Sequence, residues 1–134
     1  MRNKNVLVTG GAGFIGSNLV KYLVENDNNV KVLDNFSSGF RINLEPFKNI
    51  SIIVGDIRNR TDVEHAIRDT EVIFHLAASV GNKRSIENPI MDAEINVLGT
   101  IQILEAARKQ GIKKIVTSSS ASIYGEPKVL PIKE

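Results

Sequence analysis

Four glycines lie within seven residues near the start of the chain, at Gly10, Gly11, Gly13 and Gly16. Glycine lowers stability inside regular structure, so a cluster of this density indicates a backbone conformation or a close approach that a Cβ would prevent. The cluster follows an apolar run at residues 5–8 and precedes apolar residues that recur at helical spacing as far as Val24. The pattern predicts a strand, a tight turn and a helix, in that order.

Four further apolar segments have the length of strands, and most of them are separated by segments with the length of helices. The predicted strands cover residues 30–34, 50–56, 71–79 and 113–120. After the third of the five strands, Thr61 with Glu64 predicts a capped helix, and residues 89–110 predict one long amphipathic helix that Gly111 ends. Continuous apolar strands separated by helices are typical of a parallel sheet covered on both faces. We therefore expect an α/β fold, a Rossmann-like doubly wound parallel sheet of about five strands in the order 3-2-1-4-5.

Length and composition limit the classes of protein that the chain fits. A length of 134 residues is typical of one domain, and we expect a single domain over residues 1–134. Seventeen basic against 15 acidic residues give a formal net charge of +2, which does not favour a nucleic-acid partner. The chain has no cysteine, which excludes disulfides and thiolate metal sites, so we expect a cytoplasmic protein without a metal. No apolar run has the length of a membrane span or a signal core, so no membrane partner is expected.

In this order of elements the glycines have a specific role. Gly13 lets the backbone approach a pyrophosphate, and Gly16 lets the helix pack closely on the sheet. Backbone N–H groups at the start of the helix favour bound phosphates. Asp34 ends the second predicted strand, where an acidic residue binds the ribose diol of a dinucleotide. Because a carboxylate there repels a 2′-phosphate, the sequence predicts NAD rather than NADP as cofactor.

Small or polar residues follow every predicted strand. They are Gly10, Asp34, Gly55 with Asp56, Ala77 with Ala78, and residues 118–120. Ligands of open α/β sheets bind outside the carboxyl ends of the strands. The pattern therefore predicts one site spread over all five strand ends.

A family resemblance is carried by seven segments: TGGAGFIG, LDNFSSG, GDIRN, FHLAAS, RSIENP, NVLGT and SSSASIYGEP. Together they resemble the extended short-chain dehydrogenase/reductase family, and within it the NAD-dependent sugar-nucleotide epimerases and dehydratases, most closely the UDP-glucose 4-epimerases. The resemblance implies that bound NAD takes hydride from the fourth carbon of a nucleotide-linked hexose and returns it to the other face of the keto sugar. A nucleotide sugar is therefore the expected substrate.

The resemblance also implies roles for individual residues. The pyrophosphate would contact Gly10, Gly13, Phe14, Ile15 and Gly16, and the adenosine ribose region would contact Asp34, Asn35, Ser37, Ser38 and Gly39. Adenine would contact Asp56 and Ile57, and the nicotinamide half would lie near Ala77, Ala78 and Asn96. Ser120 matches the catalytic Ser or Thr that hydrogen-bonds the reacting sugar hydroxyl, and Ser85 falls where the family contacts its substrate.

Two departures from the family pattern narrow the expected activity. Dehydratases carry Asp-Glu where Ala121 and Ser122 stand here, which disfavours a 4,6-dehydratase. The family uses a Tyr and a Lys four residues apart on a helix, but Tyr124 and Lys128 have Pro127 between them. Proline within a helical turn removes a donor and clashes with a preceding carbonyl, so this pair is not expected to share a helix face. We expect an N-terminal, cofactor-binding part of an epimerase, truncated before the substrate domain and inactive by itself.

Two other functions stay open. A non-catalytic NAD-binding regulatory module fits the missing base, and an NAD-dependent dehydrogenase or 4,6-dehydratase of the same family fits the same cofactor site. The apolar stripe at residues 90–107 is predicted to be mainly core, and its family counterpart contributes to a dimer interface, so a homodimer through this helix is also expected. His65 is predicted to be solvated, and His75 to be buried or bonded to the backbone.

Overall fold

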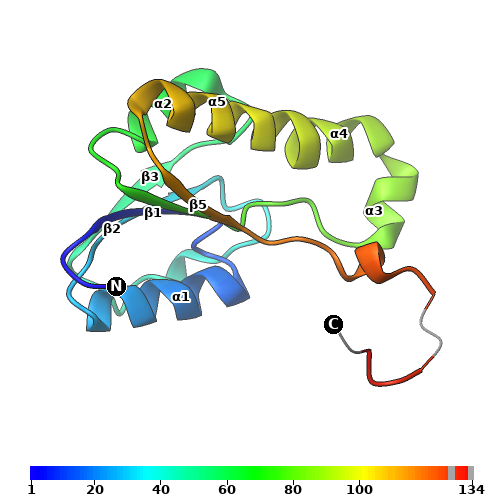
Figure 1. The fold of residues 1–134 in the computed structure, drawn as a ribbon, viewed down its shortest axis with the longest axis horizontal. Helices are drawn as coiled ribbons and strands as arrows, with labels where there is room; N and C mark the ends of the chain where they lie inside the picture. The colour runs from blue at the N-terminus through cyan, green and yellow to red at the C-terminus, as the bar shows by residue number, and fades with distance from the viewer. Residues whose placement is uncertain (127–128, 133–134) are drawn as a thin grey trace.

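The fold is a five-stranded parallel sheet with helices on both faces (Figure 1). The computed structural model describes residues 1–126 and 129–132. The strand order is β3-β2-β1-β4-β5, which confirms the predicted order. The strands are β1 (Asn5–Thr9), β2 (Asn29–Asp34), β3 (Ile50–Val54), β4 (Val72–His75) and β5 (Lys114–Thr117).

The helices form two layers around this sheet (Figure 1). One face is covered by α1 (Phe14–Glu25), and the opposite face by α2 (Arg60–Ala66) and α5 (Thr100–Gln110); α4 (Pro89–Ala93) lies in the same layer as α5 but beyond the strand ends. Shorter elements are the helix α3 (Asn82–Glu87), the π-helical η2 (Glu94–Gly99) and the 3-10 turns η1 (Arg41–Asn43) and η3 (Ala121–Tyr124). Within the described ranges, no helix is both long enough and apolar enough to cross a bilayer.

The core divides into two apolar layers, one on each face of the sheet. Alternate residues of β1 supply both layers, because neighbouring side chains of a strand point to opposite faces. On the α1 side lie Val6, Val8, Val20, Leu23, Val30, Val32 and Val72, and on the other side lie Leu7, Leu33, Val63, Ile67, Ile73, Ile103 and Ala107. The sheet is thus covered on both faces where β1, β2 and β4 pair.

The ends of several elements differ from their predicted positions. The predicted strands 50–56, 71–79 and 113–120 end early, at Val54, His75 and Thr117. The predicted cap of α2 at Thr61 is wrong: the side chain of Asn59 accepts hydrogen bonds from the N–H groups of Thr61 and Asp62. Asn59 takes this place because α2 begins two residues earlier than expected, at Arg60.

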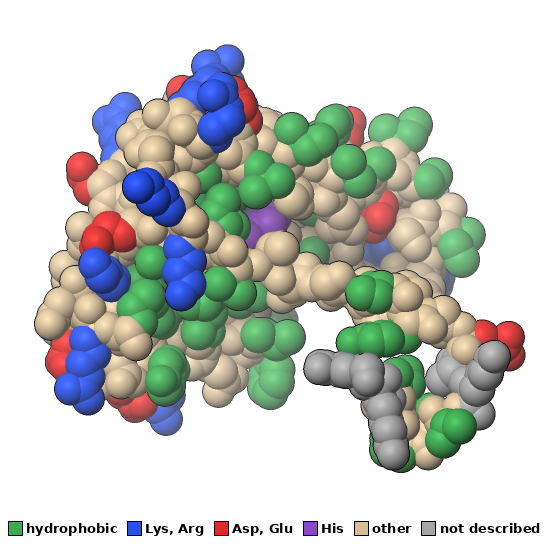
Figure 2. All heavy atoms as spheres, viewed as in Figure 1, with side chains coloured by type: hydrophobic (Ala, Val, Ile, Leu, Met, Phe, Trp, Pro, Cys, Tyr) green, Lys and Arg blue, Asp and Glu red, His purple; other side chains and the backbone are tan. Residues whose placement is uncertain are grey.

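The long helix predicted over residues 89–110 is a run of three elements, α4, η2 and α5. Gly111 ends it in the left-handed conformation at φ +71°, as predicted. Its apolar residues lie on two faces, so the prediction that the stripe is mainly core is only partly right. Gly99, Ile103, Ala106 and Ala107 are buried, whereas Ile90, Val97, Leu98, Ile101 and Leu104 are about half exposed or more. Apolar side chains are correspondingly visible on the outer surface of the helical layer (Figure 2).

Candidate functional site

The carboxyl ends of the five strands meet at one edge of the sheet, because all strand pairs are parallel. The residues that the sequence pointed to stand at or just beyond these ends: Gly10 after β1, Asp34 at the end of β2, Asp56 after β3, Ala77 after β4 and Ser118 after β5. We call this edge the carboxyl edge. The strand order puts Gly10 at its centre, with β2 and β3 on one side and β4 and β5 on the other.

The turn between β1 and α1 depends on two glycines. Gly10 has φ +71°, and a Cβ on it would lie 2.7 Å from the backbone nitrogen of Ala77. A Cβ on Gly16 would lie 2.2 Å from the carbonyl oxygen of Gly10. Both distances are shorter than any Cβ contact tolerates, so these positions require glycine for close packing of the turn, the helix and β4.

Gly13 differs from both, because a Cβ there would meet only the Gly10 carbonyl oxygen, at an ordinary 3.4 Å. Gly13 is the N-cap of α1 and provides no side-chain cap, and the first turn of α1 carries no acidic residue. The first N–H groups of a helix have no intrahelical acceptor and carry a partial positive charge. Phe14 and Ile15 are 85% and 67% exposed. Their side chains have no hydrogen-bond donor, so these two residues offer a ligand only main-chain N–H groups. The space and the donors fit a pyrophosphate.

Asp34 ties the end of β2 to this glycine turn. Its side chain is buried, with one carboxylate oxygen accepting from the Ala12 N–H at 2.9 Å and the other from the Phe36 N–H at 2.8 Å. Each oxygen keeps a second lone pair, so the group still fits a ribose diol. The loop that follows also returns to the turn, because the Phe40 N–H and the Asn43 side chain both donate to the Ala12 carbonyl.

The other residues predicted around the ribose lie on that same loop. Asn35, Ser37 and Ser38 are exposed, and the Asn35 side chain accepts from the Ser37 N–H at 3.0 Å. A Cβ on Gly39 would lie 2.8 Å from the Cβ of Ala12, so the loop passes directly against the glycine turn. The predicted ribose residues are therefore brought beside the predicted pyrophosphate residues.

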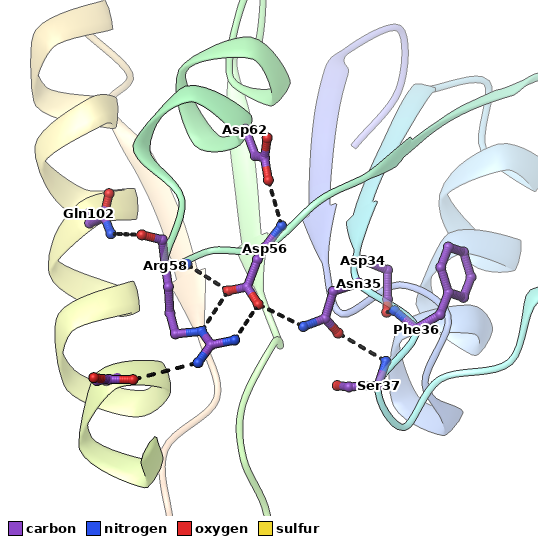
Figure 3. A network of polar contacts seen from close by, with 9 residues as sticks. Asp34, Asn35, Phe36, Ser37, Asp56, Arg58, Asp62 and Gln102 are labelled. Atoms are coloured by element: carbon purple, nitrogen blue, oxygen red, sulfur yellow. Dashed lines mark hydrogen bonds and ion pairs between the residues drawn. The ribbon is translucent and has the colours of Figure 1, made fainter. Parts of the chain in front are cut away.

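Asp56 is the centre of a polar network beyond β3 (Figure 3). One carboxylate oxygen accepts from the backbone N–H and the Nε of Arg58, and the other from Nη2 of Arg58 and Nδ2 of Asn35, all between 2.8 and 3.0 Å. The Asp56 N–H donates to the carboxylate of Asp62 at 2.9 Å. Arg58 also pairs with Glu94 of η2, at 3.6 Å. The network joins the loops after β2 and β3 to the helical layer.

This network changes the ionisation of Asp56. The hydrogen bond from the Arg58 side chain is the main cause that lowers the pKa of Asp56, from 3.8 to about 2, with further contributions from the Arg58 backbone and Asn35. The carboxylate is therefore a hydrogen-bond acceptor at every pH above about 3. It borders an open hollow of about 680 Å³ that is also lined by Arg58, Asn59, Arg60, Glu94, Leu98 and Gln102.

Ile57, the second residue predicted at adenine, lies differently. Its side chain is only 5% exposed and packs in the core, where a Cβ on Gly99 would come within 2.7 Å of it. The side chain of Ile57 is thus not offered to a ligand. Residue type alone does not distinguish a core isoleucine from one that lines a site.

The loop after β4 contains Ala77 and Ala78 and is held by Asn96. The Asn96 side chain accepts from the Ser79 N–H at 2.8 Å and donates to the Ser79 carbonyl at 2.9 Å. Both ends of the amide are therefore engaged with this loop. His75 is buried as predicted, but its partners are the hydroxyl groups of Thr9 and Thr100 rather than the backbone.

The two predicted substrate residues lie farther from the glycine turn along the chain. Ser120 follows β5, is exposed, and caps η3 by accepting from the Ser122 N–H at 3.2 Å. Ser85 lies in α3, where its hydroxyl donates to the Asn82 carbonyl at 2.9 Å. Tyr124 ends η3 and is followed by Gly125 at φ +65°, so the helix stops there, while Pro127 and Lys128 lie outside the described residues.

Comparison with known families matches this arrangement along nearly the whole chain. Residues 6–134 match the model of the NAD dependent epimerase/dehydratase family. The chain belongs to this family. The predicted family resemblance is thereby confirmed.

Known relatives show how much of a longer protein the match covers. The chain is 44% identical to a UDP-glucose 4-epimerase from Mycolicibacterium smegmatis, over 96% of the chain and 42% of the relative. It is 40% identical to a UDP-N-acetyl-alpha-D-glucosaminuronate decarboxylase from Bacillus cytotoxicus, over 92% of the chain and 38% of the relative. A crystal structure of the Thermus thermophilus UDP-glucose 4-epimerase in complex with NAD superposes with a TM-score of 0.89 at 41% identity, covering 97% of the chain and 42% of that protein. The chain thus spans about two fifths of these relatives.

The sequence patterns give no role to three residues that organise the site. They are Arg58, Asn59 and Thr100, and each stands near a residue with a predicted role. The position of Arg58 two residues after Asp56 is a usable signal, because an Asp side chain readily accepts from the backbone two residues on. The hydrogen bond between Thr100 and His75 joins residues 25 positions apart, so no short sequence pattern predicts it.

Proposed function

We propose that this chain binds NAD across the carboxyl edge, as the cofactor-binding part of a nucleotide-sugar 4-epimerase of the UDP-glucose 4-epimerase type. The observation that carries the proposal is the pairing of an open glycine turn with a fixed carboxylate. The free amides at the start of α1 suit a pyrophosphate, and Asp34, bonded to Ala12 at 2.9 Å, stands beside them for a ribose. The relative from Thermus thermophilus is described with bound NAD.

The proposed cofactor site extends to both sides of the glycine turn. The pyrophosphate would bind at Gly10, Gly13 and the main chain of Phe14, Ile15 and Gly16, and the adenosine half on the β2 side at Asp34, Asn35, Ser37, Ser38, Gly39, Asp56 and Ile57. The nicotinamide half would lie on the β4 side, near Ala77 and Ala78, with Asn96 holding their loop. The Asp34 carboxylate would repel a 2′-phosphate, which favours NAD over NADP.

The chain holds part of the residues that epimerisation would need. When bound, NAD would supply the acceptor and donor of a hydride at the sugar. Ser120 would hydrogen-bond the reacting sugar hydroxyl, and Ser85 would contact the nucleotide sugar. The 134 residues contain two tyrosines, and neither offers a Tyr-Lys pair on a helix: Tyr22 has Asn26 four residues on, and Tyr124 precedes Gly125. We therefore propose that these 134 residues bind NAD without epimerising by themselves.

A second candidate function is a non-catalytic NAD-binding module that regulates a partner. The absence of a helical Tyr-Lys pair from these 134 residues is compatible with it. The capping role of the Ser120 hydroxyl in η3 also gives this residue a structural reason to be present without catalysis. Binding of NAD by the whole protein without any binding of a nucleotide sugar would favour this candidate over an epimerase.

The organisation of the chain is part of the proposal. We propose one domain over residues 1–134, supported by a single sheet with one apolar layer on each face. We also propose that the chain pairs with a second copy through the exposed apolar face of α4, η2 and α5. The exposed Val97, Leu98 and Ile101 support this, because contiguous apolar patches mark interaction sites. Sedimentation as a monomer at high micromolar concentration would overturn it.

The test of NAD binding uses two substitutions on α1 and its cap. Isothermal calorimetry on the folded chain should give heat of association with NAD and with NADH. Gly13→Ala should keep the fold, because its Cβ meets an ordinary contact, and should weaken NAD binding by at least about tenfold by obstructing the pyrophosphate. Lys21→Ala, at an exposed position of the same helix, is the control and should leave both the fold and the affinity for NAD unchanged. If the folded chain gives no heat with either dinucleotide, the proposal of NAD binding is overturned. If these 134 residues interconvert UDP-glucose and UDP-galactose, the proposal that they do not epimerise by themselves is overturned.

A further inference from the structure

A largely buried row of polar groups runs from the sheet to the helix that covers it, beneath the carboxyl edge. It consists of Thr9 at the end of β1, His75 at the end of β4 and Thr100 at the start of α5. The hydroxyl oxygen of Thr9 lies 2.7 Å from Nδ1 of His75, and the hydroxyl oxygen of Thr100 lies 3.0 Å from Nε2. Thr9 is fully buried and His75 is 4% exposed. No binding role proposed above uses these three side chains.

The partners at the two ends of this row fix the direction of each hydrogen bond. The hydroxyl of Thr100 donates its one proton to the Asn96 carbonyl, at 2.8 Å, so the Thr100 oxygen accepts a hydrogen bond from Nε2–H of His75. Thr9 accepts from the Ala77 N–H at 3.2 Å, and its own proton is therefore free to go to Nδ1. His75 is thus a neutral imidazole with its proton on Nε2. Burial lowers the pKa of His75, which agrees with a neutral ring.

Both ends of the row lead to one loop. At one end, Thr9 holds the backbone of Ala77, and at the other, Thr100 bonds Asn96, whose side chain brackets the backbone of Ser79. The loop from Ala77 to Ser79 is therefore fastened by side chains of β1 and η2. Asn96 lies in a π-helical turn, a rare distortion that often accompanies functional sites.

The sheet order relates this loop to the proposed cofactor site. The glycine turn follows β1, Asp34 ends β2 on one side of it, and the loop from Ala77 to Ser79 follows β4 on the other side. A dinucleotide with its pyrophosphate at the turn and its adenosine half at Asp34 must extend its second half over the β4 side. The loop therefore faces the nicotinamide half, provided that the proposed function is correct.

We propose that His75, held between Thr9 and Thr100, is a positioning residue for the nicotinamide half of NAD. It would act through the loop from Ala77 to Ser79, which its hydrogen bonds keep in one conformation. It would not contact the ligand. The proposal rests on the proposed function for the identity of that ligand.

The experiment compares NAD with ADP-ribose, which lacks the nicotinamide ring. His75→Phe keeps a ring of similar size and removes both hydrogen bonds. It should weaken NAD binding by about tenfold and ADP-ribose binding by less than about twofold, since only the β4 side loses its support. Val63→Ala, in the buried face of α2, is the control for lost stability and should leave the ratio of the two dissociation constants unchanged.

A second pair of variants covers the case in which His75→Phe does not fold. Thr100→Val removes the acceptor for Nε2–H with little change of shape, and Thr100→Ser restores the hydroxyl. The valine variant should raise the NAD to ADP-ribose ratio of dissociation constants by about threefold or more, and the serine variant should return it to the wild-type value. In the wild type, nitrogen NMR should show Nε2 of His75 protonated and Nδ1 unprotonated, with the exposed His65 as the second histidine signal.

The outcomes separate the two proposals. A folded wild type that binds neither NAD nor ADP-ribose overturns the proposed function. A wild type that binds both, with equal weakening of both in His75→Phe or in Thr100→Val, overturns the positioning role alone. A proton on Nδ1 overturns the hydrogen-bond directions on which that role depends.

Discussion

The two edge strands of the sheet, β3 and β5, end at the same site but are held very differently. Beyond β3, Asp56 accepts four hydrogen bonds, its own N–H donates to Asp62, and Arg58 reaches across to Glu94 (Figure 3). Beyond β5, the described contacts are fewer: Ser118 donates to the His75 carbonyl at 3.3 Å, and Ser120 bonds Ser122. The segment after β5 then leaves the body of the protein (Figure 1).

The difference shows what makes a strand end rigid when the strand itself has only one neighbour. Both strands are poorly buried, with Val54 at 61% and Val116 at 41% exposed. Burial therefore does not distinguish them. The distinction comes mainly from Asp56 and Arg58, which lie within four residues of the end of β3 and bond each other and the backbone at little cost in chain entropy. The adenosine side of the proposed site is built in this way, and the Ser120 side is not.

The largest expected effect is a loss of stability when the central polar residue beyond each edge strand is replaced, Asp56 beyond β3 and Ser120 beyond β5. Asp56→Ala should lower the free energy of unfolding by about 2 kcal/mol, because it deprives Arg58 and Asn35 of their shared acceptor. Ser120→Ala should lower it by less than about 0.5 kcal/mol, because Ser120 is exposed and caps only a short turn. Urea unfolding followed by circular dichroism measures both. Equal losses in the two variants would contradict the distinction between the strand ends.

A smaller effect is expected at the cap that links β3 to α2. Asn59→Ala should lower the free energy of unfolding by about 1 kcal/mol, whereas Asn59→Asp should retain most of it, because Asp also accepts from the N–H groups of Thr61 and Asp62. The matched control is Thr61→Ala, which removes the residue that the sequence predicted as the cap. The same urea titrations apply, and a larger loss in Thr61→Ala than in Asn59→Ala would restore the original prediction.

The smallest effect is expected in acid. Because the pKa of Asp56 is lowered to about 2, the folded chain binds fewer protons at this group than the unfolded chain between pH 4 and 2. The stabilisation is present above about pH 4 and is lost as the pH falls toward 2. Glu105 also has a pKa lowered to about 2, by Arg108, so wild type must be compared with Asp56→Asn. Unfolding in urea from pH 5 to 2.5 should show a steeper loss in wild type, and parallel curves would exclude the role given to Asp56.

The sequence predicted the parts of this structure that depend on short-range pattern. The glycine turn and Asp34 at the end of β2 follow from apolar periodicity and from the spacing of Gly10, Gly13 and Gly16, and the strand order follows once the alternation of strands and helices is combined with the rule that crossovers are right-handed. The ends of the strands are less predictable. Residues 76–79 have the sequence pattern of a strand, but the side chain of Asn96 makes hydrogen bonds with the backbone N–H and carbonyl of Ser79, in place of a neighbouring strand. That contact joins residues 17 positions apart and has no local signature.

The prediction of one continuous helix over residues 89–110 was only partly right, again because of contacts between residues far apart in the sequence. A single apolar stripe was expected, but the π-helical turn at η2 includes Asn96, whose side chain faces the loop after β4, while Leu98 and Ile101 stay exposed. Apolar residues at helical spacing indicate that a helix forms. They do not indicate which of two apolar faces packs on the sheet, because that depends on small residues such as Gly99 and Ala107 that allow close approach.

Gly10 links the two halves of the carboxyl edge at a single point, since its Cα stands directly against the backbone of Ala77. A change in the glycine turn cannot be absorbed there without moving the segment after β4 as well. The span between the two halves is therefore a property of the folded chain and exists before a ligand arrives. If a dinucleotide binds across this edge as proposed, we therefore expect a ligand with a shorter or longer bridge than a diphosphate to fit one half and miss the other.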